Sequence, residues 1–475
     1  MLTSWAGHAR INILPDDILL LIFRFDRAIY LDRLGEVDQL GHVPSWRWHR
    51  LVHVCQRWRS VVFGSPNFLG LRLDCGPTTR VELMGVWPPF PIVIRTGKLW
   101  PMPKDYDFDA AIVHPNRVCE IYLYYLTRLQ LQRLVSAMQE QFPSLIHLML
   151  GLVDDGHPAP DLPDGFLGGS ASRLQSLELY AIGFPALPKL LLSATHLVRL
   201  ILSYTSYTSY VSPETIVTGL AALANLKYLF IEFYPVPSLP DPEIRLLPPP
   251  TRIVLPALAR FDFQGISEYL EDLVARIDAP LLDSIGITII HELAFDISQL
   301  AQFMRRSTKF PTLNETHVDF YFNVNFNQCG VQIESLPSTR TFDDKSILTI
   351  LHRESNGLLS SLGQVCAWFF PSISMVEHLH LYGEPHWQND AQGIQWLEFF
   401  HPFTAVKKLY VSKFFTRFFA LALKDLVGER STNALPALES ILLEDPHPVE
   451  AAIGPFVAAR QLLGHPVTVS DWDRT

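Results

Sequence analysis

The sequence predicts an α/β protein in which a small helical domain is followed by an irregular solenoid of strand-and-helix repeats. Two observations predict this fold. Residues 11–69 hold two apolar segments with helical spacing, INILPDDILLLIFRF and HRLVHVCQRWRSVVF. From residue 68 onward, one short pattern of apolar residues recurs at intervals of about 20 to 32 residues.

The first segment predicts a helix from Pro15 to about Phe25. Proline suits the first helical position because its missing N–H would have no partner there. Asp16 and Asp17 follow in the first turn, where the helix dipole favours negative charge. The residues after them are apolar on nearly every side, so this helix needs cover on several sides.

The second segment predicts one helix after Pro44, with Ser45 as its N-cap. Its apolar positions have helical spacing and are Trp48, Leu51, Val52, Cys55, Trp58 and Val62. This pattern places Cys55 on the packed stripe of the helix, where a thiol behaves as a small apolar side chain rather than as a nucleophile. We expect the two helices to form a helical domain at residues 1–69.

The recurring pattern has the form Φ-x-x-Φ-x-Φ, where Φ is an apolar residue. Its copies include VCEIYL (118–123), LIHLML (145–150), LQSLEL (174–179), LVRLIL (197–202), LKYLFI (226–231), LARFDF (258–263), LDSIGI (282–287), VEHLHL (376–381), VKKLYV (406–411) and LESILL (438–443). In a strand, the two apolar residues of Φ-x-Φ point inward and their neighbours face outward. Repeats of this length and pattern are typical of leucine-rich-repeat solenoids, here expected over residues 70–475 with strands on the concave face and helices outside.

Two stretches depart from the repeat. Residues 235–256 hold eight prolines and predict an extended surface loop. Further along, a strictly alternating strand is predicted from Val318, Phe320, Phe322, Val324 and Phe326. We expect a turn at Gln328–Gly330 to lead into a second strand ending at Glu334, which makes a hairpin over residues 317–335.

Composition limits the class of protein. The net charge of −10 argues against nucleic acid as a main partner, because phosphate binding needs a basic field. The five cysteines are odd in number and form no CxxC pair, which predicts reduced thiols in the cytoplasm or the nucleus. The longest uncharged run is too polar for a membrane span, and residues 1–10 lack the apolar core of a signal peptide. No membrane association is expected.

No catalytic motif is complete. His291-Glu292 begins like the HExxH zinc motif, but Phe295 stands where the second ligand is needed. His378 and His380 lie two residues apart on a predicted strand, and a histidine pair without a third ligand is a weak metal site. The sequence holds neither GxxxxGK nor GxSxG. We therefore expect no enzyme activity, no cofactor and no metal.

The remaining candidate site is the outward face of the predicted strands. Aromatic and arginine side chains dominate the energetics of protein interfaces, and stacked strands would align them on one concave surface. An ordinary solvated sheet face is the alternative interpretation. The expected substrate-binding residues are Tyr122, Tyr124, Tyr180, Arg199, Tyr228, Phe230, Arg260, Asp262, His378, His380, Tyr382, Lys408 and Tyr410.

The N-terminal residues resemble an F-box. The resemblance is carried by Leu14-Pro15, Ile18-Leu19, Ile22-Phe23, Leu51, Val54-Cys55, Trp58-Arg59 and Val61. The later tract resembles F-box-like proteins of mushroom-forming fungi, most closely at LSSLGQVC (359–366), QWLEFFHPFTAVKKLYVSK (395–413), LKDLVGER (423–430), LPALESILLE (435–444) and FVAARQLLGHPVTVSDWD (456–473). One departure is the insertion at 26–43, which is longer than the connection an F-box usually has.

The resemblance implies a substrate-recognition subunit of a Skp–cullin–F-box ubiquitin ligase. The helical domain would bind the Skp adaptor, and through it the cullin ligase, while the solenoid would bind a substrate protein. The residues that match the motif and would bind or support the adaptor contact are Leu14, Pro15, Ile18, Leu19, Ile22, Leu51, Val54 and Trp58. The alternative is a non-catalytic repeat scaffold whose F-box-like helices only cap the exposed end of the solenoid.

Overall fold

The computed structural model describes residues 13–34, 48–76, 88–96, 109–153, 161–205, 211–234, 252–290, 298–307, 315–323, 328–335, 346–352, 373–383, 393–416, 430–445 and 450–472, together with residues 419, 423 and 426. Two compact units divide the chain. The first holds residues 1–153 and 165–168, and the second holds residues 154–164 and 169–475. The domain boundary expected after residue 69 is a different division and stays a prediction.

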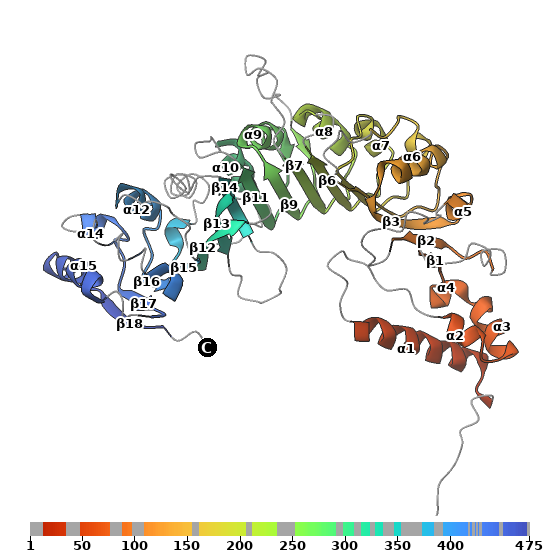
Figure 1. Ribbon diagram of the computed structural model, residues 1–475, viewed down its shortest axis with the longest axis horizontal. Coiled ribbons are helices and arrows are strands. Elements are labelled where there is room, and N and C mark those ends of the chain that lie inside the picture. The colour runs from red at the N-terminus through yellow and green to blue at the C-terminus, as the bar shows by residue number, and fades with distance from the viewer. Residues whose placement is uncertain are drawn as a thin grey trace, which may run out of the picture. The chain divides into compact units, whose positions relative to one another are not determined.

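The first unit begins with four helices and continues with parallel strands (Figure 1). Its elements are α1 (Asp16–Leu34), α2 (His49–Val52), α3 (Gln56–Gly64), α4 (Pro66–Leu69), β1 (Leu73–Cys75), β2 (Ile92–Arg95), α5 (Asp109–Ile112), β3 (Val118–Leu126), α6 (Arg128–Ala137) and β4 (His147–Leu152). A 3-10 turn, η3 (Phe166–Gly169), follows. Strands β1 to β4 pair in chain order, all parallel.

The second unit repeats the strand-and-helix alternation. Its helices are α7 (Leu187–Leu191), α8 (Pro213–Leu220), α9 (Ser267–Ala275), α10 (Ser298–Arg305), η5 (Ile373–Met375), α12 (Gly393–Phe400), α14 (Arg430–Asn433) and α15 (Glu450–Leu462). Its strands are β5 (Ser176–Tyr180), β6 (Arg199–Thr205), β7 (Tyr228–Tyr234), β8 (Ile253–Val254), β9 (Arg260–Gly265), β10 (Ile277–Asp278), β11 (Ser284–Ile290), β12 (Glu315–Asn323), β13 (Gln328–Ser335), β14 (Ser346–His352), β15 (His378–Gly383), β16 (Lys408–Val411), β17 (Ser440–Leu443) and β18 (Thr468–Asp471).

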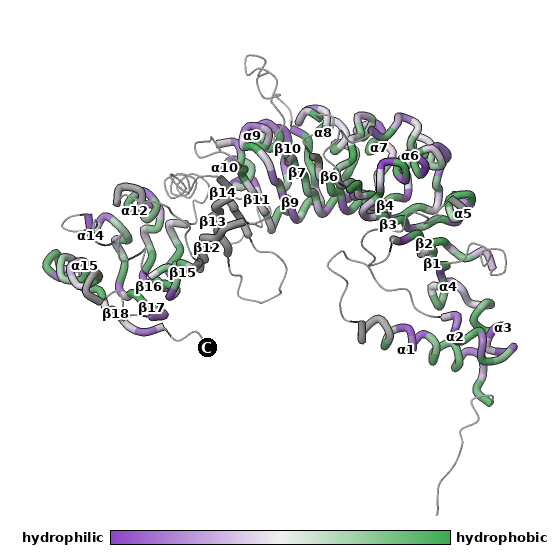
Figure 2. Tube along the Cα trace, in the orientation of Figure 1, coloured by the Kyte–Doolittle hydropathy of each residue, from purple (hydrophilic) through white to green (hydrophobic). Residues whose placement is uncertain are grey.

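The inward positions of the repeat pair with one another across the sheet. Leu177, Leu200, Leu229, Phe261 and Ile285 are register partners on neighbouring parallel strands, and each is at most 3% exposed. Each repeat therefore buries its apolar residues against the repeats beside it, which is how a solenoid makes one long core. Figure 2 shows hydrophobic and hydrophilic residues alternating along β6, β7 and β9. The fold is an α/β leucine-rich-repeat-like solenoid, as the periodicity predicts.

Strands β12, β13 and β14 stand in reverse chain order in the sheet, and one of them is antiparallel to its neighbours. Strand β13 runs antiparallel to both β12 and β14, while β14 pairs parallel with β11 and β12 pairs parallel with β15. The hairpin expected at 317–335 corresponds to β12 and β13. Gln328, Cys329 and Gly330, where the sequence predicts a turn, lie instead within β13 and pair with Tyr321–Asn323. Val324, Phe326 and most of the proline-rich loop at 235–256 lie outside the described residues.

The first helix is longer than predicted. Helix α1 runs to Leu34, nine residues beyond Phe25, so the first half of the expected insertion at 26–43 continues the helix. No proline or glycine occurs between Phe25 and Leu34, and nothing local therefore ends the helix at the point where the apolar run stops. Among the described residues, no helix is long and apolar enough to cross a membrane.

The second predicted helix is two helices. Helix α2 ends at Val52, and α3 begins at Gln56 with Cys55 as its N-cap. The thiol of Cys55 accepts a hydrogen bond from the backbone N–H of Trp58 at 3.4 Å. Cys55 has extended backbone dihedrals, which helical spacing alone does not reveal. Its predicted position inside one continuous apolar stripe is therefore wrong, and the predicted N-cap Ser45 lies outside the described residues.

Candidate functional site

Helix α1 has two apolar faces. Leu19 and Phe23 form the inner face and are at most 1% exposed. The ring of Phe23 lies 4.8 Å from the ring of Trp58 on α3, which fixes α1 against that helix. These contacts hold the N-terminal helices together and leave the rest of α1 facing outward.

The outer face of α1 is an exposed apolar stripe, which we call the α1 stripe. Its residues are Ile18, Leu21, Ile22, Phe25 and Ile29, with exposed fractions of 38%, 46%, 40%, 69% and 48%. At 100° per residue they fall within an arc of about 100° on one side of the helix. A contiguous row of large apolar side chains on a helix surface indicates a docking surface.

Polar contacts orient the N-terminal end of α1, and a close steric contact follows farther along the helix. Arg57 on α3 donates from Nε to Oδ1 of Asp16 at 2.9 Å and also donates to the backbone carbonyl of Leu14. Farther along the helix, the guanidinium of Arg27 lies over Gly70, the C-cap of α4, whose φ is +59°. A Cβ at Gly70 would lie 2.9 Å from Nη1 of Arg27. The N-terminal helices therefore hold the α1 stripe in a defined orientation within the first unit.

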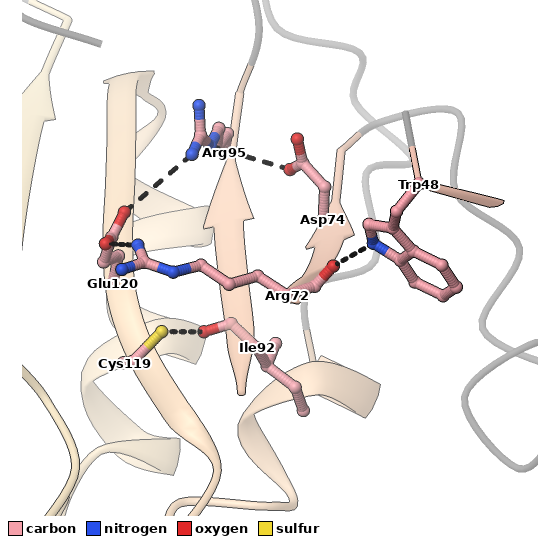
Figure 3. A network of polar contacts seen from close by, with 7 residues as sticks. All are labelled: Trp48, Arg72, Asp74, Ile92, Arg95, Cys119 and Glu120. Carbon is pink, nitrogen blue, oxygen red and sulfur yellow. Dashed lines mark hydrogen bonds and ion pairs between the residues drawn. The ribbon is translucent and has the colours of Figure 1, made fainter. Parts of the chain in front are cut away.

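A second set of contacts joins the helices to the first strands. The ring of Trp48 packs 5.5 Å from the ring of Phe90, and its indole N–H donates to the carbonyl of Arg72 at 2.9 Å. The Arg72 side chain in turn pairs with Glu120 on β3 (Figure 3). The helices therefore cover the start of the sheet as well as carrying the α1 stripe.

The outward strand face of the first unit continues this polar network. Glu120 also lies 3.8 Å from Nη2 of Arg95 on β2, and Arg95 lies 3.7 Å from Asp74 on β1 (Figure 3). The predicted site residue Tyr122 stacks on His147 at 6.3 Å and lies below the guanidinium of Arg95. Adjacent strands therefore align charged and aromatic side chains on this face, as the periodicity predicts.

Two thiols near this network, Cys75 and Cys119, are buried. Burial raises the pKa of Cys75 to about 12, and burial also raises the pKa of Cys119. The Cys119 thiol donates to the carbonyl of Ile92 at 3.3 Å (Figure 3). Thiols with a raised pKa are protonated at neutral pH and are poor nucleophiles.

In the second unit the strand register forms rows of outward residues. Arg199, Tyr228 and Arg260 are register partners on β6, β7 and β9. Arg199 lies with its guanidinium carbon 4.3 Å from the Tyr228 ring centre, and the guanidinium of Arg260 lies 5.5 Å from it. Glu178 and Asp262 accept hydrogen bonds from the two arginines at 2.9 and 2.8 Å. We call these five residues the arginine–tyrosine cluster.

The cluster is partly buried, and its electrostatics reflect that burial. Burial raises the pKa of the Tyr228 hydroxyl, and the nearby Asp262 carboxylate, which accepts its hydrogen bond, raises it further. Asp262 is itself buried, while the Arg199 and Arg260 side chains are 45% and 33% exposed. The arginines are therefore more exposed than the acids that they contact.

An aromatic cluster lies on β15 and β16 near the C-terminus. His380 and Tyr410 are register partners whose rings stack with centres 4.0 Å apart and an interplanar angle of 2°. Trp472, which follows β18, packs edge-on against both rings. Tyr382 lies 5.8 Å from Trp472, and His378 stacks on Tyr410. Sequence periodicity missed Trp472 because it stands after the last repeat strand.

The predicted adaptor residues differ in exposure and fall into three groups. Leu19 is fully buried and supports the helices, whereas Leu14, Leu51 and Trp58 are half-buried. The exposed members are Pro15, Ile18, Ile22 and Val54. Leu21, Phe25 and Ile29 share the α1 stripe but were missed, because they fall at positions that the F-box resemblance does not name. Helical periodicity from Ile18 could have found them.

The predicted substrate residues also differ in exposure. Asp262 and His380 are buried, so they support their neighbours more than they meet a partner. Lys408 and Arg199 are exposed, and the remaining members are half-buried: Tyr122, Tyr124, Tyr180, Tyr228, Phe230, Arg260, His378, Tyr382 and Tyr410. Within the described parts of the chain, no group of three His, Cys, Asp or Glu side chains is arranged to hold a metal ion.

Comparison with known proteins gives limited information. No family model matches the chain, and no curated protein matches it. One similar solved structure is the leucine-rich repeat-containing protein LegL7 from Legionella pneumophila. The two sequences are 13% identical, the match covers 83% of this chain and 98% of LegL7, and the TM-score is 0.28. At that TM-score, the assignment of the repeat fold rests on the strand register described above.

Proposed function

We propose that this protein is the substrate-recognition subunit of a Skp–cullin–F-box ubiquitin ligase. The N-terminal helices bind a Skp adaptor through the α1 stripe. The solenoid binds a substrate protein through the outward face of its strands. The chain contributes no catalytic residue, acts inside the cell, and works by holding the substrate near the ubiquitin-transfer machinery, which raises the effective concentration of the substrate.

The α1 stripe carries this proposal. Its five apolar side chains face outward although Leu19 and Phe23 already supply a buried face for packing α1. Moving side chains such as Ile18 and Ile22 from water into an interface contributes about 1.5 to 3 kcal/mol each when burial is complete. The F-box resemblance supplies the identity of the partner, because Ile18 and Ile22 match its motif.

The capped scaffold remains the second candidate, and one observation favours it. Trp48 packs on Phe90 and bonds to Arg72, so the N-terminal helices do cover the first strands. That contact uses Trp48 on the N-terminal side of α2, whereas the α1 stripe lies on another helix. Capping the first strands and binding an adaptor are therefore compatible roles. The adaptor experiment decides whether the chain binds an adaptor.

Co-expression of the full chain with a fungal Skp adaptor, followed by size-exclusion chromatography, tests the proposal. The wild-type chain is expected to elute as a one-to-one complex. The double variant Ile18→Asp, Ile22→Asp is expected to lose the adaptor, because two charges would enter an apolar interface. The matched control is Val113→Asp with Leu129→Asp, which alters two apolar residues of 71% and 73% exposure away from α1.

Either of two results overturns the proposal. A folded wild-type chain that elutes apart from the adaptor supports the capped scaffold instead. Equal loss of the adaptor in the control variant shows that the α1 stripe is not the contact. Circular dichroism of both variants distinguishes loss of binding from loss of folding.

A further inference from the structure

Trp472 covers part of the outward strand face in the last repeats of the sheet. It follows β18, and its backbone N–H donates to the carbonyl of Leu443 at 2.7 Å, which continues the pairing of β18 with β17. Its ring nevertheless packs against Tyr410 on β16 and His380 on β15, with ring centres 5.3 and 5.7 Å apart. The indole therefore reaches back across β17 to contact residues of β15 and β16.

These ring contacts do not seal the end of the solenoid. A terminal cap covers the apolar residues of the last repeat. Here Val469 on β18 and Leu462 at the end of α15 are 39% and 88% exposed. Trp472 leaves these residues exposed and packs instead on the outward face, where Tyr410 and His380 are register partners. Its position therefore calls for an explanation other than capping.

The Trp472 side chain is held by ring packing. Among the described residues, no atom accepts a hydrogen bond from its indole N–H, whereas the indole N–H of Trp48 donates to the carbonyl of Arg72. A tryptophan that belongs to a permanent core usually has such a hydrogen-bond partner. Trp472 is only half-buried, so water reaches part of the ring. Another aromatic side chain can supply the same ring contacts.

Lys408 places a positive charge beside these rings. Lys408 and Tyr410 are two residues apart on β16, so their side chains leave the same face of the strand about 6.7 Å apart. Lys408 is exposed, and within the described parts of the chain no carboxylate pairs with its ammonium group. The neighbouring Lys407, by contrast, pairs with Glu377 at 2.8 Å. A carboxylate of a partner therefore meets complementary charge next to an aromatic surface.

We propose that Tyr410 and His380 form the binding place of an aromatic side chain of the partner protein, and that Trp472 occupies this place until the partner displaces it. Lys408 binds a carboxylate two residues away from that aromatic in the partner. In an extended segment, residues i and i+2 share one face about 6.7 Å apart, which matches the spacing of Lys408 and Tyr410. This inference rests on the proposed role of the strand face as a substrate receptor and names the chemistry of the substrate.

Fluorescence anisotropy with the full chain tests the proposal. The probe is the fluorescein-labelled peptide Gly-Glu-Gly-Trp-Gly-Glu-Gly, whose two glutamates supply a carboxylate in either strand direction. A surface that its own side chain covers in about nine molecules of ten binds a ligand about tenfold more weakly than the open surface. Trp472→Ala is therefore expected to bind the probe about tenfold more tightly than the wild type does. A peptide with alanine in place of tryptophan should show no such gain.

Further variants assign the binding to this surface. Tyr410→Ala, added to Trp472→Ala, is expected to abolish the gain because it removes the ring on which the probe packs. Lys408→Gln is expected to weaken the probe about threefold, the effect of an exposed ion pair, and to leave unchanged a peptide with glutamines in place of the glutamates. Phe414→Ala is the matched control, because it removes an aromatic side chain of 57% exposure that packs beside Lys413 instead.

The inference is overturned if folded Trp472→Ala binds the probe no more tightly than the wild type, or if Phe414→Ala tightens binding equally. Thermal unfolding of each variant reports folding. Trp472→Phe answers the same question if Trp472→Ala is unfolded, because a smaller ring in the same place is expected to give an intermediate affinity. A Phe variant that binds the probe as the wild type does then overturns the inference.

Co-purification of Trp472→Ala with the Skp adaptor tests the proposed function separately. A variant that keeps the adaptor and binds the probe more tightly supports both proposals. A variant that keeps the adaptor without the gain in affinity overturns this inference alone. Tighter binding of the probe by a folded chain that does not bind the adaptor overturns the ligase proposal and leaves the aromatic binding place supported.

Discussion

Arg460 is a charged side chain in the core, and the periodicity of the sequence did not predict its burial. Arg460 on α15 is fully buried, and its guanidinium donates to the carbonyls of Ser431, Ala434, Leu435, Pro436, Leu438 and His465. It closes the turn before β17 by satisfying carbonyls that would otherwise be buried without partners. In the sequence Arg460 looks like an ordinary charged helix residue, because all but one of its partners are carbonyls more than twenty residues away.

Glu232 on β7 gives a prediction for the dependence of stability on pH. Burial raises its pKa above the ordinary 4.5, and the hydrogen bond from Ser203 Oγ at 2.6 Å offsets that only in part. As pH rises above 4.5, the unfolded chain releases this proton before the folded chain does, so the free energy of unfolding falls until the pH passes the raised pKa.

The variant Glu232→Gln removes this dependence. The wild-type melting temperature is expected to fall relative to that of the variant as the pH is raised from 4 to 8. Differential scanning calorimetry across that range measures the difference. Glu214→Gln, at an exposed position on α8, is the control and should track the wild type. A constant difference between Glu232→Gln and wild type at all pH values would rule out a raised pKa.

At the scale of elements, local patterns predicted where helices and strands occur but not always where they end. The inward positions of the repeat strands agree with the sequence, because alternation depends on the strand alone. The extent of α1 and the break between α2 and α3 do not follow from hydrophobic spacing. The break at Cys55 depends on a thiol that caps α3, and thiols are not usual N-caps.

Gly70, the C-cap of α4, lies against Arg27 of α1. Its φ of +59° lies in the left-handed region, and Arg27 of α1 fills the space where a Cβ would stand. Gly70→Ala is expected to lower the free energy of unfolding by about 1 to 2 kcal/mol, because alanine is strained at this φ even if the Arg27 side chain moves. Chemical denaturation of the full chain, followed by Trp fluorescence, measures the loss.

Gly64→Ala is the matched control for this change. Gly64 is the last residue of α3, and a Cβ there would meet nothing within 4 Å. Alanine at a helical position with free space is expected to be neutral or to stabilise by a few tenths of a kcal/mol, at most about 1. Equal destabilisation by both substitutions would argue against the special role of Gly70.

At the scale of the whole molecule, a solenoid is stabilised mainly by contacts between neighbouring repeats. Disturbance at one end should therefore spread over the nearest repeats and fade with distance. The N-terminal helices provide such an end, because Trp48 packs on Phe90 and Phe63 at 5.5 and 6.1 Å. Their loss would expose the first strands to water.

Trp48→Ala tests this picture. Amide hydrogen exchange is expected to accelerate in β1, β2 and β3 and to stay unchanged in β15 to β18, because each repeat contacts only its neighbours. Mass spectrometry of the full chain after exchange locates the change. Arg50→Ala, at an exposed position on α2, is the control. Faster exchange throughout the chain would show that the molecule unfolds as one cooperative unit instead.

The sequence by itself determined the repeat fold and the inward residues of its strands, because both follow from local alternation and a fixed period of apolar residues. It also predicted which side chains share the outward face. Only the tertiary structure decided that Leu19 and Phe23 are buried while Ile18 and Ile22 face solvent, that Arg199 and Arg260 flank one tyrosine, and that Trp472 packs on β16. These arrangements depend on residues far apart in the chain, whose approach is set by packing rather than by local pattern.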